Sequence, residues 1–153
     1  MIDIVNQGAG LEMAVTKLIR GAEKVVQALG DWPTFHDAEI ISFSALRAML
    51  MEANSSSANL RVHVRQYQAV GAGTANYELA LTKSVLISFL FSGLSHMTIA
   101  EFNHQNVIDS IQFTPTEDGE ILVCIDAIWG LGGQIKCKTV SIDFIQELPV
   151  GCA

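Results

Sequence analysis

The chain has 153 residues, enough to bury a full core and few enough for a single domain over residues 1–153. Half of the residues are hydrophobic and only 16% are charged, a composition that argues against disorder. Sixteen acidic residues against nine basic ones give a net charge of −7. Nucleic acid is therefore excluded as an expected partner, because phosphate binding depends mainly on lysine and arginine.

Three further patterns indicate where such a chain would reside. The longest apolar stretch, residues 84–94, is well short of the roughly 20 residues of a membrane-spanning helix, so we expect no membrane. The first residues lack the basic and apolar segments of a signal peptide. Cys124, Cys137 and Cys152 are widely spaced, which is typical of free thiols in a reducing compartment. We therefore expect a cytoplasmic protein.

Helical periodicity comes first in the chain. Residues 1–10 show no clear period and are expected to form a loose arm. Over residues 11–29, apolar side chains recur at steps of three and four, which predicts one amphipathic helix (Leu11, Val15, Leu18, Ala22, Val25, Val26 and Leu29). Gly30 and Pro33 are typical of a helix end. The apolar stripe of this helix must be covered, so we expect it to pack on a sheet.

Alternation of apolar and polar residues then predicts a sheet over residues 38–148. Seven strand-like runs follow one another with short turns and no helical crossovers, at residues 40–46, 60–67, 81–91, 97–102, 107–113, 120–129 and 134–144. Gly93 is expected to end the third run, and Gly130 to Gly133 to join the last two as a hairpin. The sequence therefore predicts an α+β fold, with an N-terminal helix followed by a mainly antiparallel, roughly seven-stranded meandering sheet.

The densest group of distinctive side chains lies between helix and sheet, in Asp31-Trp32-Pro33-Thr34-Phe35-His36-Asp37-Ala38-Glu39. His36, Asp37 and Glu39 are candidate metal ligands, since imidazole and carboxylate suit zinc, iron or manganese. An extended segment would, however, place Asp37 and Glu39 on one face and His36 on the other, and no HExxH motif is present. The alternative is structural: Trp32 and Phe35 fill the space between helix and sheet, while His36 or Asp37 caps backbone groups of the turn.

Two other polar groups have open interpretations. The turn Asn103-His104-Gln105-Asn106 is rich in amides, which either bond to their own backbone or bind a partner. Arg61, His63, Arg65 and Tyr67 share one face of a predicted strand and form either a recognition surface or a solvated face. No G-x-S-x-G elbow or phosphate-binding loop is present. We therefore predict no catalytic residue, no metal and no cofactor, and a protein that is not an enzyme.

Residues 32–40 resemble the W-P-S-F-H-D-A-E-V signature of a bacterial immunity-protein family, immunity protein 50. The segment Phe102-Asn103-His104-Gln105-Asn106-Val107-Ile108 and the closing strand with Lys136-Cys137 are similar to further features of that family. The likeness covers roughly Leu29 to Leu148, with Thr34 in place of the usual serine, and leaves out the helical region before Leu29. It implies a small α+β domain that neutralises a toxin of a polymorphic toxin system.

Three hypotheses follow. The first is an immunity-like protein that neutralises a cognate and basic bacterial toxin by direct contact, with interface candidates Trp32, His36, Asp37, Glu39, Asn103, His104 and Asn106. The second is a small metal- or ligand-binding enzyme that uses His36, Asp37 and Glu39. The third, compatible with both, is a homo-oligomer, because a mean hydropathy of +0.35 is high for a soluble monomer.

Overall fold

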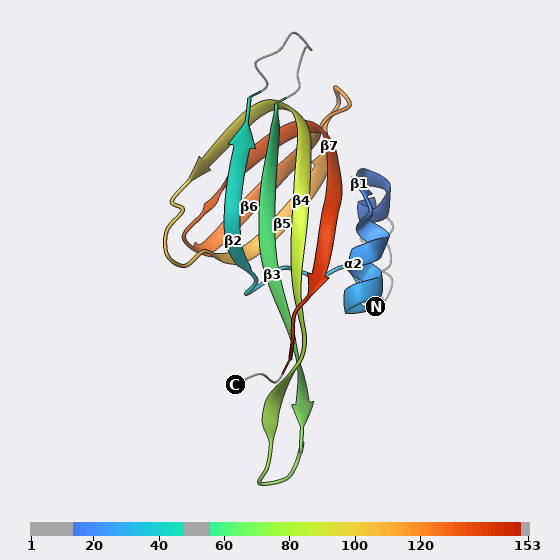
Figure 1. Ribbon diagram of the computed structural model, residues 1–153, viewed down its shortest axis with the longest axis vertical. Helices are drawn as coiled ribbons and strands as arrows, with labels where there is room; N and C mark the ends of the chain where they lie inside the picture. The colour runs from blue at the N-terminus through green and yellow to red at the C-terminus, as the bar shows by residue number, and fades with distance from the viewer. Residues whose placement is uncertain (1–13, 48–55, 151–153) are drawn as a thin grey trace, which may run out of the picture.

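The computed structural model describes residues 14–47 and 56–150, and it confirms the predicted α+β fold with a mainly antiparallel sheet (Figure 1). The expected arm over residues 1–10 and Cys152 lie outside the described residues. The elements are β1 (Ile19–Arg20), α2 (Ala22–Leu29), β2 (Glu39–Leu46), β3 (Ser57–Val70), β4 (Glu78–Ala100), β5 (Val107–Pro115), β6 (Ile121–Trp129) and β7 (Gly132–Glu147).

The sheet consists of two three-stranded meanders joined along both edges. Strands β2, β3 and β4 form one meander, and β5, β6 and β7 form the other. Strand β4 pairs with β7 over most of its length, while β2 meets β5 at Glu39 and Val107. The sheet therefore curls until its two ends meet, and β1 adds a short parallel pairing to β7 (Figure 1).

The helical region differs from the single helix expected over residues 11–29. Residues 14–18 are helical, but Ile19 and Arg20 then pair with Val140 and Ser141 of β7. At Gly21 the backbone adopts a left-handed conformation (φ 82°), and a Cβ there would lie 3.3 Å from the Cβ of Ile142. Glycine thus permits both the change of direction and the close approach to β7. Val15, Ala22, Val25 and Leu29 of the predicted stripe are buried on both sides of the break, which is why the apolar periodicity did not reveal it.

Strand β4 also differs from the prediction, because it contains both the third and the fourth expected runs. Gly93 does not end the strand: β4 pairs with β7 on both sides of it, at Ser92 with Thr139 and at Leu94 with Cys137. Its positive φ of 70° lies next to the register shift that β4 makes between Leu94 and His96. The strand as a whole bends over the top of the molecule (Figure 1). Seven strands were expected and the described residues form seven, but the two sets differ. The run expected at residues 97–102 is part of β4, and β1 was not expected.

The core lies inside the curled sheet and beneath the helix. Trp32 packs edge-on against Phe35, Phe89 and Phe113, with ring centroids 5.5, 6.4 and 6.1 Å apart. Phe35 is 2% exposed, and Trp32 is half-buried against the core. Both rings therefore pack among aromatic side chains of β4 and β5 inside the curled sheet, and their expected place between helix and sheet stays a prediction.

Two side chains, one from β3 and one from β4, form hydrogen bonds with the C-terminal end of α2. Nζ of Lys83 donates to the carbonyl oxygen of Ala28 (2.9 Å), and Nε2 of Gln66 donates to that of Leu29 (3.1 Å). The last turn of α2 contains no basic residue of its own, so Lys83 supplies the cation that favours a helix C-terminus. These bonds fix the point from which the chain turns towards β2.

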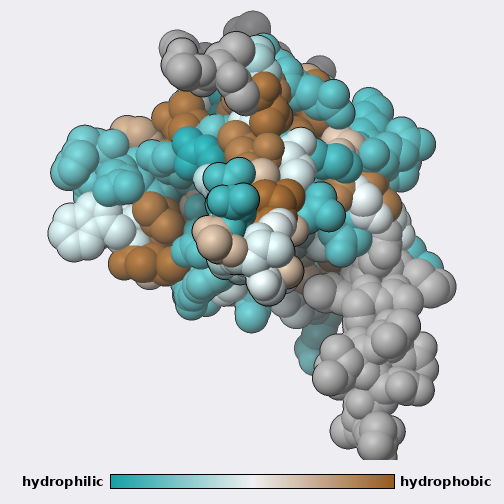
Figure 2. Space-filling view, turned by 90° about the horizontal axis from the view of Figure 1, so that it is seen from below, coloured by the Kyte–Doolittle hydropathy of each residue, from teal (hydrophilic) through white to brown (hydrophobic). Residues whose placement is uncertain are grey.

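No helix within the described residues is long and apolar enough to cross a membrane. From below, hydrophobic residues form several separate patches between hydrophilic ones (Figure 2).

Candidate functional site

The connection from α2 to β2, residues 31–38, is a tight turn fastened to β5. Two of its residues, Phe35 (φ 63°) and Asp37 (φ 66°), adopt the left-handed conformation, which costs about 1 kcal/mol or more for each non-glycine residue. Three backbone hydrogen bonds hold it: Ala38 N–H to Phe35 O (3.0 Å), Asp37 N–H to Ile108 O (3.0 Å) and Ile108 N–H to Ala38 O (2.8 Å). Backbone strain held by surrounding structure is characteristic of functional segments, and here it fixes the exposed side chains at the turn.

His36 lies between two carboxylates on the surface of this turn. Its Nδ1 donates to the backbone oxygen of Asp109 at 3.2 Å and lies 3.2 Å from a carboxylate oxygen of the same residue. Its Nε2 lies 3.7 Å from a carboxylate oxygen of Asp37. The backbone oxygen of Asp109, followed by the negative charge of Asp37, raises the pKa of His36 above its usual 6.5. All three side chains are more than half exposed, so a partner can reach them.

Asp37 and Glu39 do not share the face that an extended segment would give them. Asp37 belongs to the turn, whereas Glu39 is the first residue of β2, half-buried and opposite His63 of β3 and Val107 of β5. The described residues contain no group of three or more histidine, cysteine, aspartate or glutamate side chains placed to hold a metal ion. The geometry gives no support to the enzyme hypothesis built on His36, Asp37 and Glu39.

The amide-rich turn lies directly beside this segment, because Ile40 N–H donates to Asn106 O (2.8 Å). Asn106 is 3% exposed and its side chain is fully engaged. Its Oδ1 accepts from the N–H groups of Asn103 and Leu131 (both 3.0 Å), and its Nδ2 donates to Asn103 O (2.8 Å). Asn106 therefore links three segments and holds the amide-rich turn in position, but its buried side chain is not available to a partner. Asn103 and His104 of the same turn are exposed.

The sequence prediction missed Asp109 and Val64 as contributors to this site, and it left Arg65 and Tyr67 open as part of either a recognition surface or a solvated face. Asp109 contacts His36 although the two residues are 73 positions apart in the sequence. One carboxylate among the alternating residues of a predicted strand does not indicate such a contact. Val64, Arg65 and Tyr67 of β3 also line the site, where they form the far wall of a cleft of about 410 Å³ beside His36, Asp37 and Ala38. A second cleft, of about 240 Å³, lies between Asp31 to His36 and β3 residues 64–66.

Histidine and serine also meet within the sheet. Nε2 of His63 lies 2.6 Å from Oγ of Ser84, and burial lowers the pKa of His63 below 6.5, which favours the neutral form that a general base needs. However, Ser84 is only 7% exposed, so a substrate cannot reach its hydroxyl group. No hydrogen bond between described residues orients the other ring nitrogen of His63. The pair therefore lacks the third member and the access that nucleophilic catalysis requires.

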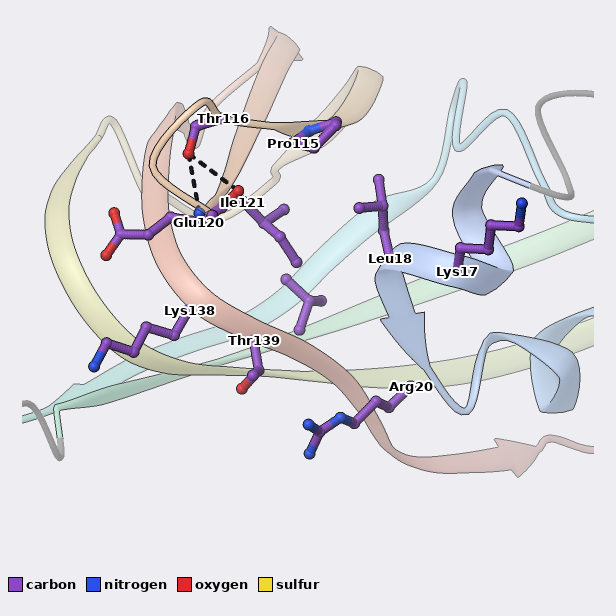
Figure 3. Close-up of a pocket in the computed structure, with 11 residues that line it drawn as sticks. Lys17, Leu18, Arg20, Pro115, Thr116, Glu120, Ile121, Lys138 and Thr139 are labelled. Carbon is purple, nitrogen blue, oxygen red and sulfur yellow. Dashed lines mark hydrogen bonds between the residues drawn. The ribbon is translucent and has the colours of Figure 1, made fainter.

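A further cleft, of about 290 Å³, lies between the N-terminal helical turn, the β5–β6 turn and β7 (Figure 3). Its basic side chains do not converge, because Lys17 and Lys138 extend in opposite directions. Inside the β5–β6 turn, Thr116 Oγ1 accepts from Glu120 N–H (3.1 Å) and donates to Glu120 O (3.1 Å), so these groups bond one another. This cleft therefore gathers no chemistry that recognises a ligand.

A family model described as Immunity protein 50 matches residues 21–147, which confirms the family that the sequence resembles. No curated protein matches the chain, and no solved structure matches it.

Proposed function

The chain belongs to the immunity protein 50 family, and we propose that it neutralises a bacterial toxin by direct contact through the turn that joins α2 to β2. Membership over residues 21–147 is the observation that carries the proposal, because an immunity protein has a toxin as its partner. Binding is consistent with the site, where the side chains of His36, Asp37 and Asp109 are all more than half exposed.

The charge of the turn defines the partner that it fits. Asp37 and Asp109 are exposed on either side of His36, and the whole chain carries a net charge of −7. A basic surface on the toxin would meet this turn with complementary potential, which speeds association and fixes orientation more than it adds affinity. Lysine and arginine side chains at the rim of the toxin's active site are suitable contacts.

The roles of the candidate residues differ within this proposal. His36, Asp37, Asn103 and His104 are exposed and make contacts, and Glu39 contributes from its half-buried position at the start of β2. Trp32 and Asn106 act by holding the turn in place, since Trp32 packs against the aromatic core and the Asn106 side chain is buried. The rigid sheet behind the turn keeps these contacts preorganised, which reduces the entropic cost of binding.

A charge-reversal experiment tests the assignment. The double variant Asp37→Lys/Asp109→Lys and the control Glu117→Lys are mixed with the toxin domain encoded by the neighbouring gene, and affinity is measured at low and at high salt. Glu117 is exposed in the β5–β6 turn, beyond the end of β5 at Pro115, which is six residues and therefore about 20 Å along the strand from Asp109. We expect the double variant to bind roughly tenfold more weakly at low salt, with a smaller difference at high salt.

The control separates local contact from overall charge. Glu117→Lys should change the affinity by less than about twofold, because its charge is far from the turn. An unchanged affinity for the double variant would remove the turn from the interface. Equal losses for the double variant and the control would mean that net charge alone steers the toxin. A wild-type chain that neither binds nor inhibits the toxin would refute the proposed function as a whole.

A further inference from the structure

Strands β3 and β4 continue beyond the rest of the sheet as a two-stranded ribbon (Figure 1). The pairing of β2 with β3 ends at Glu39 and His63, and the pairing of β4 with β7 ends at Val85 and Glu147. The pairing of β3 with β4 continues to Val70 and Glu78. Residues 64–70 of β3 therefore have β4 on one side and no described strand on the other.

The direction of the backbone groups shows what this open edge offers. The carbonyl oxygen of Gln66 accepts a hydrogen bond from Oγ1 of Thr82, so it faces β4. Backbone groups of successive residues in a strand point to opposite sides. The N–H and C=O groups of Arg65, Tyr67 and Ala69 therefore face the open edge, where an additional strand would find both donors and acceptors.

This edge carries few of the features that normally prevent strands from pairing with other chains. Natural edge strands carry lysines, prolines or bulges that block such pairing. Residues 64–84, which make up the ribbon and its loop, contain three charged residues, Arg65, Glu78 and Lys83, and no proline. The register shift between Gln66 and Tyr67 has its extra residue, Thr82, on β4 and not on the open edge. Four large side chains on the ribbon are exposed: Tyr67 by 56%, Val70 by 37%, Tyr77 by 57% and Leu79 by 63%. A weakly protected edge with exposed apolar side chains is typical of a surface that is covered in a complex.

The open edge begins beside the candidate site. The cleft of about 410 Å³ is lined by Val64, Arg65 and Tyr67 from β3 and by His36, Asp37 and Ala38 from the turn. A strand laid along β3 would therefore direct a side chain into this cleft, where Asp37 and Arg65 offer one charge of each sign beside His36. The edge on the β4 side has no such neighbour, because Leu148 N–H donates to Ser84 O (2.8 Å) and the end of the chain runs beside it.

We propose that residues 65–69 of β3 form a β-addition site, on which an extended segment of the toxin pairs as a further strand and places a side chain in the cleft beside His36. This inference rests on the proposed function and adds the mode of recognition. Main-chain bonds to Arg65, Tyr67 and Ala69 would supply affinity, and the cleft, with the charges of Asp37 and Arg65, would supply specificity, as in other complexes formed by strand addition.

Amide hydrogen exchange of the wild-type chain, measured by NMR with and without the neighbouring-gene toxin domain, tests this pairing. Strand addition predicts an alternating result. Exchange at Arg65, Tyr67 and Ala69 should slow by about tenfold or more, while Gln66 and Gln68, which face β4, should change little. Binding of the toxin without extra protection at the three edge amides would overturn the inference and leave the proposed function intact.

A pair of variants provides a second test. Ala69→Pro removes an N–H group from the open edge, and Ala69→Ser keeps that group while changing the side chain. Ala69→Pro should weaken toxin binding by about tenfold, the equivalent of a lost hydrogen bond, whereas Ala69→Ser should bind like wild type. Equal affinities for the two variants would contradict a role of the edge N–H.

Two other outcomes are distinguishable in the same experiments. Light scattering of the chain alone gives its mass, with 16.6 kDa expected for a monomer. A dimer that Ala69→Pro dissociates would assign the edge to a second copy of this chain and overturn the toxin as its occupant. Failure of the wild-type chain to bind the toxin at all would refute the proposed function, not only the mode of binding.

Discussion

Replacement of Asn106 by alanine tests most directly how the candidate site is held together. Asn106 lies at the junction of three segments: its own turn, the β6–β7 turn through Leu131, and β2 through Ile40. Asn106→Ala removes the side-chain bonds but leaves the backbone bond to Ile40 in place. The matched control is Asn103→Ala in the same turn, because the side chain of Asn103 is exposed and bonds only to Glu101 O and Gln105 N–H.

The expected cost follows from the bonds that are lost. Asn106 makes three side-chain hydrogen bonds, each contributing about 1 kcal/mol net to stability. The Leu131 N–H is buried and would lose its partner, and an unsatisfied buried donor costs about 1–3 kcal/mol. The two contributions overlap for that bond, so we expect Asn106→Ala to lower the free energy of unfolding by about 3–4 kcal/mol. Asn103→Ala should cost about 1 kcal/mol or less, because water replaces its exposed bonds.

Urea unfolding, followed by tryptophan fluorescence and circular dichroism, measures both changes. A loss of about 3 kcal/mol is a large share of the 5–15 kcal/mol that is typical of a domain, so the midpoint should fall clearly with little change in slope. The reasoning would be refuted if Asn106→Ala cost no more than Asn103→Ala, since the buried network would then contribute nothing beyond an ordinary turn.

Further predictions concern the helix end and the side chains of His36 and His63. Lys83→Met should lower the free energy of unfolding by about 1 kcal/mol by removing the bond to Ala28 O, and a smaller loss for Lys83→Arg would show that the charge at the helix end matters. In NMR titrations, His36 should titrate above its usual pKa of 6.5 and His63 below it. Because its folded-state pKa is raised, His36 contributes stability that is present below pH 6.5 and lost as the pH rises through that raised value. His63 has the opposite sign: its contribution is present above pH 6.5 and is lost as the pH falls through its lowered pKa. Asp37→Asn should lower the pKa of His36 and leave that of His63 unchanged, and a shift at His63 instead would contradict the contacts described for the turn.

The strands that alternate strongly could be predicted from the sequence. The hairpin expected at residues 120–129 and 134–144 is β6 and β7, joined where the glycine-rich turn was expected. The alternation in β3 placed Leu60 and Val62 inside and Arg61 and Arg65 outside, as found. Gly93 was misleading because a glycine with a positive φ either ends a strand or bends it, and only the pairing with β7 decides between the two. The closure of the sheet depends on pairings between distant strands, which no local pattern encodes.

Only part of the candidate site could be predicted from the sequence. The segment Trp32 to Glu39 was recognised by its composition and by its resemblance to the family. The partners of that segment were not, since Asp109 and Arg65 reach it only through the folding of β5 and β3 alongside it. Asn106 illustrates the same limit. An amide side chain in a turn can form the same hydrogen bonds with its own backbone or with a partner protein, and only its burial in the structure distinguishes the two roles.

The central claim is that this chain neutralises a toxin by binding it. The most direct measurement is a titration of the purified chain into the purified toxin domain encoded beside it, with toxin activity and complex mass recorded on the same samples. We predict loss of toxin activity that is complete at one equivalent, together with a stoichiometric complex of the two chains. Full toxin activity in the presence of excess chain, with each protein at its own mass, would contradict the claim.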